Sequence, residues 1–220
     1  WETEYRRMVM TKKQRALLAV EALKKEYPDA ICSLTYTDPL QLLIATRLSA
    51  QCTDARVNLV TPALFERFPT LDAFCAGSEE EIAELIRSCG LYKTKAKDIF
   101  NMCHVLRDTY GGVIPDTVEE LTKLPGVGRK TANLVVGDIY KKPAVVTDTH
   151  CIRIANRLGL TESTVPLKVE KDLRAVLPPE ESNDFCHRTV LHGRAVCSAG
   201  SAKCASCCMR AFCKNPVQKD

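Results

Sequence analysis

The sequence predicts an all-α protein. Apolar residues recur at every third or fourth position through most of the 220-residue chain, which is the period of a helix with one buried face. Helix-capping residues stand where these stretches begin, and glycine or proline stands where they end. The alternating pattern of a strand is nearly absent. We therefore expect about ten helices joined by short loops.

Start and stop signals bound each expected helix in the first half of the chain. Capping boxes at Thr11, Ser78 and Thr117 offer a side-chain acceptor to the free amides of a helix start. Asp38 before Pro39 marks another start, and the residues that follow are so uniformly apolar that this helix should be central in the core. The expected helices run from Thr11 to Pro28, over 40–48, from Thr53 or Asp54 to near Phe68, from Ser78 to a stop at Gly90, and over 93–110 to a stop at Gly111.

The second half continues this pattern around a glycine-containing turn. Thr117 opens a short helix, the turn Leu124-Pro-Gly-Val-Gly128 follows, and a second helix continues to about Tyr140. The segment from about residue 117 to residue 137 is therefore expected to form a helix–hairpin–helix. The remaining helices are expected over 148–158, 166–177 and about 182–193.

Composition excludes several classes of protein. With 45% hydrophobic and 26% charged residues, the chain can bury a core without disulfides, and it is neither disordered nor collagen-like nor a coiled coil. No window of about 18 uncharged apolar residues exists, which excludes a membrane-spanning helix. The first residues are partly acidic and lack the apolar run of a signal peptide. We expect a soluble cytoplasmic protein that does not bind membranes.

The twelve cysteines are unevenly distributed. Five of them crowd a C-terminal segment that is too poor in apolar residues to order itself without a metal centre. Four of the five have the spacing C-x6-C-x2-C-x5-C and are predicted ligands: Cys197, Cys204, Cys207 and Cys213. Zinc and a [4Fe–4S] cluster both use four thiolates, and the single C-x2-C pair favours the cluster. Cys208 is expected to be a free thiol.

The other seven cysteines are spread singly among apolar helical residues. We expect each of them to be a small buried side chain without a role in chemistry. They are Cys32, Cys52, Cys75, Cys89, Cys103, Cys151 and Cys186.

The glycine-containing turn has the composition of a phosphate-binding nest. Gly126 and Gly128 permit positive φ and, with Val127, bring backbone amides toward an anion, while the next helix adds the positive end of its dipole. Contacts of this kind carry no base information, so the turn is predicted to hold a DNA backbone without sequence preference. An ordinary helix–helix corner is the alternative.

Two residues could carry covalent chemistry. Arg129 and Lys130 begin the helix after the turn, where the dipole disfavours the ammonium form; each suits either phosphate contact or chemistry. Asp148 can cap its helix and can also present a carboxylate. An amine and a carboxylate that meet at a sugar form an imine-forming pair, and only the fold decides whether these two meet.

Together these motifs resemble the endonuclease III family. The resemblance runs in order from about Thr11 to Cys213 and rests on the cysteine spacing and on the segments 49–54, 90–92, 124–133, 146–150 and 191–194. It implies a bifunctional DNA glycosylase and β-elimination abasic-site lyase that removes oxidised pyrimidines from double-stranded DNA during base-excision repair. It also implies a monomer with two helical domains and a DNA-binding cleft between them. These would be a cluster-bearing domain of residues 1–31 and 143–220 and a six-helix barrel domain of residues 32–142.

The resemblance also assigns roles to residues. Lys130 corresponds to the Schiff-base nucleophile and Asp148 to its carboxylate partner, while Gln51 and Leu91 correspond to residues that enter the duplex where the damaged nucleotide is flipped out. The four predicted ligand cysteines correspond to those of a [4Fe–4S] cluster. In the family the loop between the first two cysteines is basic and contacts DNA phosphates, but here residues 198–203 contain a single basic residue, Lys203.

Two other functions compete with this one. An adenine-type mismatch glycosylase of the same superfamily would share the cluster and the carboxylate, but it would not need the amine of Lys130. A non-catalytic DNA-binding or redox module would use the hairpin and the cluster alone.

Overall fold

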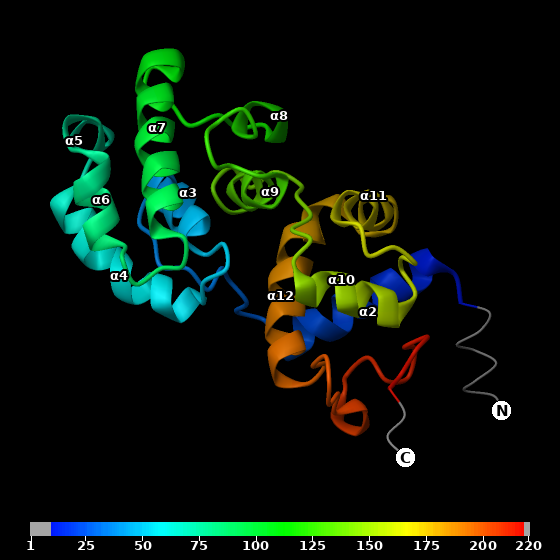
Figure 1. The fold of residues 1–220 in the computed structure, drawn as a ribbon. Coiled ribbons are helices and arrows are strands. Elements are labelled where there is room, and N and C mark those ends of the chain that lie inside the picture. Colours follow the sequence, from blue (N-terminus) through cyan, green and yellow to red (C-terminus); the bar gives the residue numbers. More distant parts are fainter. Residues whose placement is uncertain (1–9, 218–220) are drawn as a thin grey trace. The chain divides into compact units, whose positions relative to one another are not determined.

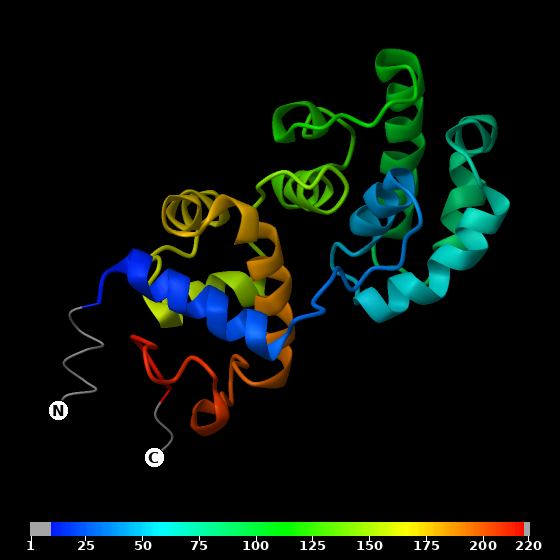
Figure 2. The same cartoon turned by 180° about the vertical axis from the view of Figure 1, so that it is seen from behind.

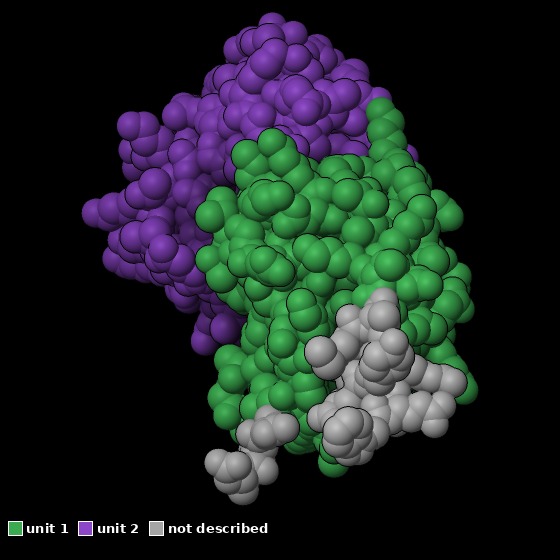
Figure 3. All heavy atoms as spheres, turned by 90° about the vertical axis from the view of Figure 1, so that its right-hand side faces the viewer, with its two compact units in different colours: residues 1–31, 141–220 green, residues 32–140 purple. Residues whose placement is uncertain are grey.

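Every regular element that the structure describes is a helix. The computed structural model describes residues 10–217, and in that range the chain is all-α, as the sequence predicts (Figure 1). The chain divides into two compact units, one of residues 1–31 with 141–220 and one of residues 32–140 (Figure 3). No helix in the described range combines the length and apolar character needed to cross a membrane.

The unit of residues 32–140 is built around one apolar helix. Helix α3 contacts α4, α7 and α9, and its Leu42, Leu43 and Ile44 are completely buried, which confirms its predicted central position. Burial of a leucine or isoleucine side chain contributes about 1.5–3 kcal/mol each. The helices of this unit are α3 (Pro39–Leu48), α4 (Asp54–Arg67), α5 (Leu71–Ala76), α6 (Glu79–Leu85), α7 (Tyr92–Tyr110), α8 (Val118–Leu121) and α9 (Arg129–Asp138).

Helix α5 is the element that the sequence patterns did not predict. Thr70 caps it by accepting a hydrogen bond from the amide of Ala73 at 3.1 Å. The helix is held by Phe74, which is buried and stacks on Phe68 with ring centroids 4.9 Å apart. Six residues are too few to display helical periodicity, so tertiary packing of one aromatic side chain decides the structure here.

The second unit combines the first α-helix of the described range with its last three. Helices α2 (Lys12–Glu26), α10 (Thr149–Leu158), α11 (Pro166–Val176) and α12 (Ser182–Ala195) pack together (Figure 2). Two short 3-10 helices, η1 (Pro179–Glu181) and η2 (Cys204–Ser206), flank α12 in the sequence. Helix α12 extends to Ala195, beyond its predicted end near Gly193.

The capping boxes form as predicted in two of three cases. At Thr11 and at Ser78 both reciprocal hydrogen bonds are present. At Thr117 the hydroxyl accepts from the amide of Glu120, but the Glu120 carboxylate accepts from Lys123 and Tyr110 instead of turning back to Thr117. Only one of the two reciprocal hydrogen bonds therefore forms at Thr117, because Lys123 and Tyr110 compete for the Glu120 carboxylate.

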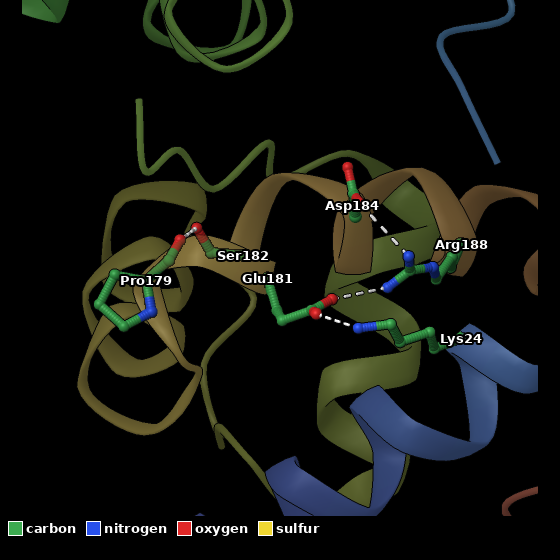
Figure 4. Close-up of polar contacts among 6 residues, drawn as sticks. All are labelled: Lys24, Pro179, Glu181, Ser182, Asp184 and Arg188. Atoms are coloured by element: carbon green, nitrogen blue, oxygen red, sulfur yellow. Dashed lines mark hydrogen bonds and ion pairs between the residues drawn. The ribbon is translucent and has the colours of Figure 1, made fainter. Parts of the chain in front are cut away.

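An ion-pair network joins α2 to the start of α12 (Figure 4). The Glu181 carboxylate accepts hydrogen bonds from Lys24 Nζ at 2.5 Å and from Arg188 Nη1 at 3.0 Å. Arg188 also pairs with Asp184 at 3.3 Å, and only 4% of its side chain is exposed. The hydrogen bond from Lys24, with a further one from Arg188, holds the pKa of Glu181 below its ordinary value.

Glu181→Gln is expected to lower the free energy of unfolding at neutral pH by about 1–3 kcal/mol, because a buried guanidinium loses its best acceptor. A carboxylate with a lowered pKa stabilises the fold above the ordinary glutamate pKa of about 4.3 and stops doing so as the pH falls through the folded-state value. The difference between wild type and variant, measured by urea unfolding, should therefore shrink below about pH 4.3.

Glu84→Gln is the matched control, because the Glu84–Arg87 pair is 67% exposed on both sides. It should change stability by less than about 0.5 kcal/mol. Equal effects of the two substitutions would contradict the importance of the Glu181 network.

Candidate functional site

The hairpin turn joins α8 to α9, and only one of its two glycines has a positive φ. Gly126 has φ of +72°, and a Cβ atom there would stand 2.8 Å from Arg47 Nε and 2.8 Å from Asp98 Cβ. Gly128 has φ of −88° and is the N-cap of α9, with open space around the position of a Cβ. The prediction that both glycines supply positive φ is therefore wrong for Gly128. Its missing side chain instead leaves the start of α9 uncovered.

The ion pair under the turn fixes the turn's position. Arg47 of α3 donates to Asp98 Oδ2 of α7 from Nε at 2.8 Å and from Nη2 at 2.6 Å. Both side chains are largely buried, at 15% and 24% exposed. Gly126 rests directly on this pair. Sequence reasoning missed both residues, since a charged pair between distant helices leaves no local signal.

Not every amide of the turn is available to an anion. The Val127 side chain is buried, and its amide donates to the Leu124 carbonyl at 3.2 Å inside the turn. The predicted role of Val127 as an amide donor therefore does not fit this conformation. No side chain caps α9, so the amides around Gly128 and in the first turn of α9 are the ones that can meet a phosphate.

Arg129 and Lys130 are the first two residues of α9, and both are exposed. Each side chain therefore stands beside the uncapped helix start. A phosphate bound at that start would bring a nucleotide next to the Lys130 amine. The geometry suits a nucleophile that is placed by backbone contacts to its substrate.

Asp148 caps α10, as its position in the sequence suggests. Its Oδ1 accepts from the Cys151 amide at 2.7 Å, and the side chain is half-buried. Its Oδ2 makes no hydrogen bond with the residues that the structure describes, so half of the carboxylate remains able to act on a ligand. Asp148 belongs to the unit of residues 1–31 and 141–220, whereas Lys130 belongs to the unit of residues 32–140.

Gln51 and Leu91 share an unusual backbone conformation. They have φ of +53° and +58°, and among residues 10–217 only Lys141 is a further non-glycine residue with positive φ. Both side chains are exposed, Leu91 to 58%. Strained backbone of this kind costs about 1–3 kcal/mol per residue and is concentrated at functional sites. The residues predicted to enter the duplex are thus held in strained, exposed positions.

One pocket of the other unit is lined by all four cysteines of the predicted cluster. Ile154, Leu158 and Met209 supply apolar walls. Burial raises the pKa of Cys213 to about 11, and the charges of the other three thiols act in the same direction. Four mutually repelling thiolates need bound cations in place of their protons. The cysteines are Cys197, Cys204, Cys207 and Cys213.

A zinc ion and an iron–sulfur cluster place four thiolates differently. Around one zinc ion the thiolates would lie about 3.8 Å apart, since a tetrahedral Zn–S bond is about 2.3 Å long. At the corners of an iron–sulfur cube they bind different irons. Within residues 10–217 no three His, Cys, Asp or Glu side chains are grouped to hold one metal ion.

Basic side chains surround the cysteine pocket. Arg157 Nη1 donates to Cys197 Sγ at 3.1 Å and to the Ser198 carbonyl at 2.8 Å. Arg153 Nε donates to the Cys197 carbonyl at 2.9 Å, and His192 Nε2 lies 3.3 Å from Cys207 Sγ. These residues offset negative charge and hold the segment in place. The spacing of Arg153 and Arg157, one turn apart on α10, was the signal that sequence reasoning left unused.

Cys208 differs from its neighbour Cys207. A hydrogen bond from the Cys208 thiol is the main cause that lowers the pKa of Cys207, and the same bond raises the pKa of Cys208. Cys207 is therefore the thiolate of the pair and Cys208 the protonated thiol. Cys208 does not line the pocket.

Lys203 has an exposed side chain on a fixed backbone. Its amide donates to the Val196 carbonyl at 2.9 Å, and it precedes the first residue of η2. A lysine placed in this way can reach a phosphate, but it is the single basic residue of the loop 198–203.

The sequence of this chain matches those of known proteins. The family of HhH-GPD superfamily base excision DNA repair proteins matches residues 44–179. Endonuclease III of Synechocystis sp. is 47% identical over 208 residues, 94% of this chain and 95% of the relative. Endonuclease III of Bacillus subtilis is 41% identical over 195 residues, 88% of this chain and 89% of the relative.

The fold of this chain is similar to those of solved structures. A trapped endonuclease III–DNA covalent intermediate is 44% identical and superposes with a TM-score of 0.87, covering 94% of this chain and 97% of that chain. A thermostable thymine-DNA glycosylase, 21% identical, superposes with a TM-score of 0.78 over 91% of this chain and 95% of that chain. At that identity the likeness concerns the fold alone.

Gly126→Ser is expected to lower the free energy of unfolding by about 1–3 kcal/mol, because a Cβ at positive φ would also displace the Arg47–Asp98 pair. Gly128→Ser, at an ordinary φ with open space, should stay within about 0.5 kcal/mol of wild type. Urea unfolding of both variants measures the difference, and similar losses at the two positions would refute it.

Proposed function

The chain belongs to the endonuclease III family of helix–hairpin–helix DNA-repair proteins, and we propose that it is a base-excision DNA glycosylase with abasic-site lyase activity that removes oxidised pyrimidines from double-stranded DNA through a Lys130 Schiff base. The observation that carries the proposal is an exposed lysine in the first turn of α9, directly after a hairpin with an uncapped helix start.

The hairpin binds the DNA backbone and thereby places the lysine. Amides around Gly128 and the dipole of α9 attract one phosphate, while the Arg129 side chain can contact another. These contacts are independent of sequence, as a repair enzyme that meets lesions in any context requires. Lys203 adds one further phosphate contact from the other unit.

Gln51 and Leu91 take the place of the extruded nucleotide. A nucleotide must leave the stack before its C1′ atom can be attacked, which costs a few kcal/mol. An exposed leucine and an exposed amide on rigid, strained backbone can fill the vacated space without a large loss of conformational entropy. Leu91 restores apolar contact with the neighbouring bases, and Gln51 offers hydrogen bonds to the unpaired base.

The chemistry uses an amine and a carboxylate. Neutral Lys130 Nζ attacks C1′ and forms a C–N bond as the glycosidic bond breaks, and the base leaves with its bonding electrons and takes up a proton. Asp148 accepts the proton that the lysine loses and stabilises the positive charge on the sugar. The sugar ring opens to an imine, a 2′ proton is removed, and the 3′ phosphate leaves by β-elimination, which nicks the strand.

The four pocket cysteines are suited to hold a [4Fe–4S] cluster. Four thiols, an apolar wall and two arginines of α10 that bond to the Cys197 segment suit a cluster whose irons bind thiolates and whose thiolate-bound form is anionic. When bound, the cluster supplies cross-links that order a segment with little core of its own. None of the proposed chemistry requires an electron carrier, so we assign the cluster a structural and DNA-positioning role.

The proposed partner is duplex DNA with a damaged pyrimidine or an abasic site, bound by a monomer. We place the protein in the bacterial cytoplasm, at the nucleoid.

Lys130→Gln is expected to abolish borohydride trapping on abasic duplex DNA, since no other amine of the hairpin can form the imine. Trapping is measured as a covalent protein–DNA band. Lys123→Gln is the matched control, because Lys123 lies in the same hairpin but is paired with Glu120, and it should leave trapping intact. If the wild type gave no trapped product, the lyase assignment would fail and a non-catalytic DNA-binding module would be favoured.

Asp148→Asn separates the two roles of Asp148. Asparagine still caps a helix, so folding should be retained, whereas loss of the carboxylate should slow trapping by about 10²–10⁴-fold. An unchanged trapping rate would leave Asp148 with the capping role alone.

Cys204→Ser is expected to remove the brown colour of the purified protein, because one corner of the cluster loses its ligand. Cys208→Ser, the adjacent non-ligand, should keep the colour. Absorbance and iron content measure both outcomes, and colourless wild-type protein that contains zinc would refute the cluster.

A further inference from the structure

Four cysteines outside the metal pocket form two pairs. The side chain of Cys52 interacts with that of Cys89, and the side chain of Cys151 with that of Cys186. The prediction that the seven scattered cysteines are single is therefore wrong for these four, and Cys32, Cys52 and Cys75 are half-buried instead of buried. Neither pair takes part in the proposed reaction or in cluster binding. The two pairs differ in where they lie.

Cys52 and Cys89 belong to the two segments that carry Gln51 and Leu91, one cysteine in each. A Cβ atom on Gly90 would stand 3.3 Å from the Gln51 carbonyl oxygen, so the backbones of the segments are in contact. Each cysteine is within two residues of a strained residue that is proposed to enter the duplex. A covalent bond between the thiols would therefore join these two segments directly.

A buried lysine holds the same region together. Lys95 is completely buried, and its Nζ donates to the Leu48 carbonyl at 2.8 Å, which ties α7 to the last residue of α3. Burial lowers the pKa of Lys95, and nearby Cys52 and Cys89 act on it in the opposite direction. The lysine therefore fixes the backbone beside both thiols.

The two thiols are unequal. Cys52 is half-buried and so within reach of a small oxidant, whereas Cys89 is 1% exposed. Burial raises the pKa of Cys89 to about 11, and the charge of Cys52 and its hydrogen bond add to the shift. Cys89 therefore keeps its proton. An accessible thiol that reacts first and a protected thiol that resolves it form the arrangement of an oxidation site.

We propose that Cys52 and Cys89 form a disulfide when the protein meets a peroxide, and that this bond weakens binding to damaged DNA by fixing the segments that carry Gln51 and Leu91. The second part rests on the proposed function. The Cys52 thiolate attacks one peroxide oxygen, and the O–O bond breaks to give a sulfenic acid and hydroxide, which takes up a proton to form water. The Cys89 sulfur then displaces the second oxygen as water, so that two thiols lose two electrons and one hydrogen peroxide becomes two waters.

The expected effect on DNA binding follows from geometry. A disulfide holds its sulfur atoms about 2.05 Å apart, much closer than two hydrogen-bonded thiols. Drawing the sulfurs together moves two segments whose backbones are already strained and in contact. The disulfide should therefore hinder insertion of Gln51 and Leu91 into a duplex. The affinity for the duplex should fall by about fivefold or more, which is the lower end of typical coupling between two sites.

Peptide mapping of the holoprotein tests the disulfide without any DNA. The protein is treated with hydrogen peroxide, remaining thiols are alkylated, and linked peptides are identified by mass spectrometry. A Cys52–Cys89 linkage is expected, while Cys151 and Cys186, both buried, should be alkylated after unfolding and serve as the internal control. If peroxide left Cys52 and Cys89 free under conditions that modify the half-buried Cys75, the oxidation site would be disproved.

Binding to a duplex with a tetrahydrofuran abasic analogue tests the consequence. Peroxide should raise the Kd of the wild type about fivefold or more, and dithiothreitol should restore it. Cys52→Ala and Cys89→Ala should bind like the reduced wild type before and after peroxide, and Cys75→Ala should respond like the wild type. A Kd that rises equally in Cys52→Ala would assign the effect to the cluster and overturn the proposal, as would a mapped disulfide with unchanged Kd. Failure of the reduced wild type to bind the analogue would instead contradict the proposed function, and the peptide map would still stand.

Discussion

The ion pair between Arg47 and Asp98 is the contact on which the geometry of the unit of residues 32–140 depends. It joins the central helix α3 to the long helix α7 under limited solvent exposure, where a bidentate charge-assisted pair is strongest. The hairpin rests on it through Gly126, so the start of α9 and the Lys130 amine are positioned from below. One residue further along α3, the Leu48 carbonyl accepts from Lys95 of α7, just before the segment with Gln51. One helix pair thus positions the proposed nucleophile, the hairpin amides and the two residues proposed to enter the duplex.

The unit of residues 1–31 and 141–220 is held together in a different way. Its last segment buries a few apolar side chains, Ala202, Met209 and Phe212, and polar contacts to α10 and α12 hold it as well. Arg153 and Arg157, which donate to the Cys197 segment, act in two ways. They fix the segment before a metal centre is bound, and they lower the electrostatic cost of bringing four thiolates together. Residues outside the four cysteines therefore suit the pocket to the thiolate-bound cluster that we propose.

The sequence allowed the helices to be predicted, and the four cysteines of the pocket to be grouped, because their signals are local. Caps at Thr11 and Ser78 and the apolar run after Pro39 each specify structure within a few residues. Helix α5 escaped prediction because one stacked aromatic pair forms it, and the role of Gly128 was misjudged because two glycines in one turn cannot be told apart without dihedral angles. Arg47, Asp98 and the thiol pairs are contacts between distant residues, which periodicity and capping rules do not record.

The packing of α2 on α12 has a consequence during protein synthesis. At about 5–20 residues per second, a ribosome needs on the order of ten seconds or more to pass from α2 to α12. For that interval the face of α2 formed by Ala16, Ala19, Val20 and Leu23, which is buried in the finished protein, has no partner. The unit of residues 32–140 is meanwhile complete once Tyr140 has been made. The nascent chain therefore exposes this apolar face of α2 until the helices that cover it have been made.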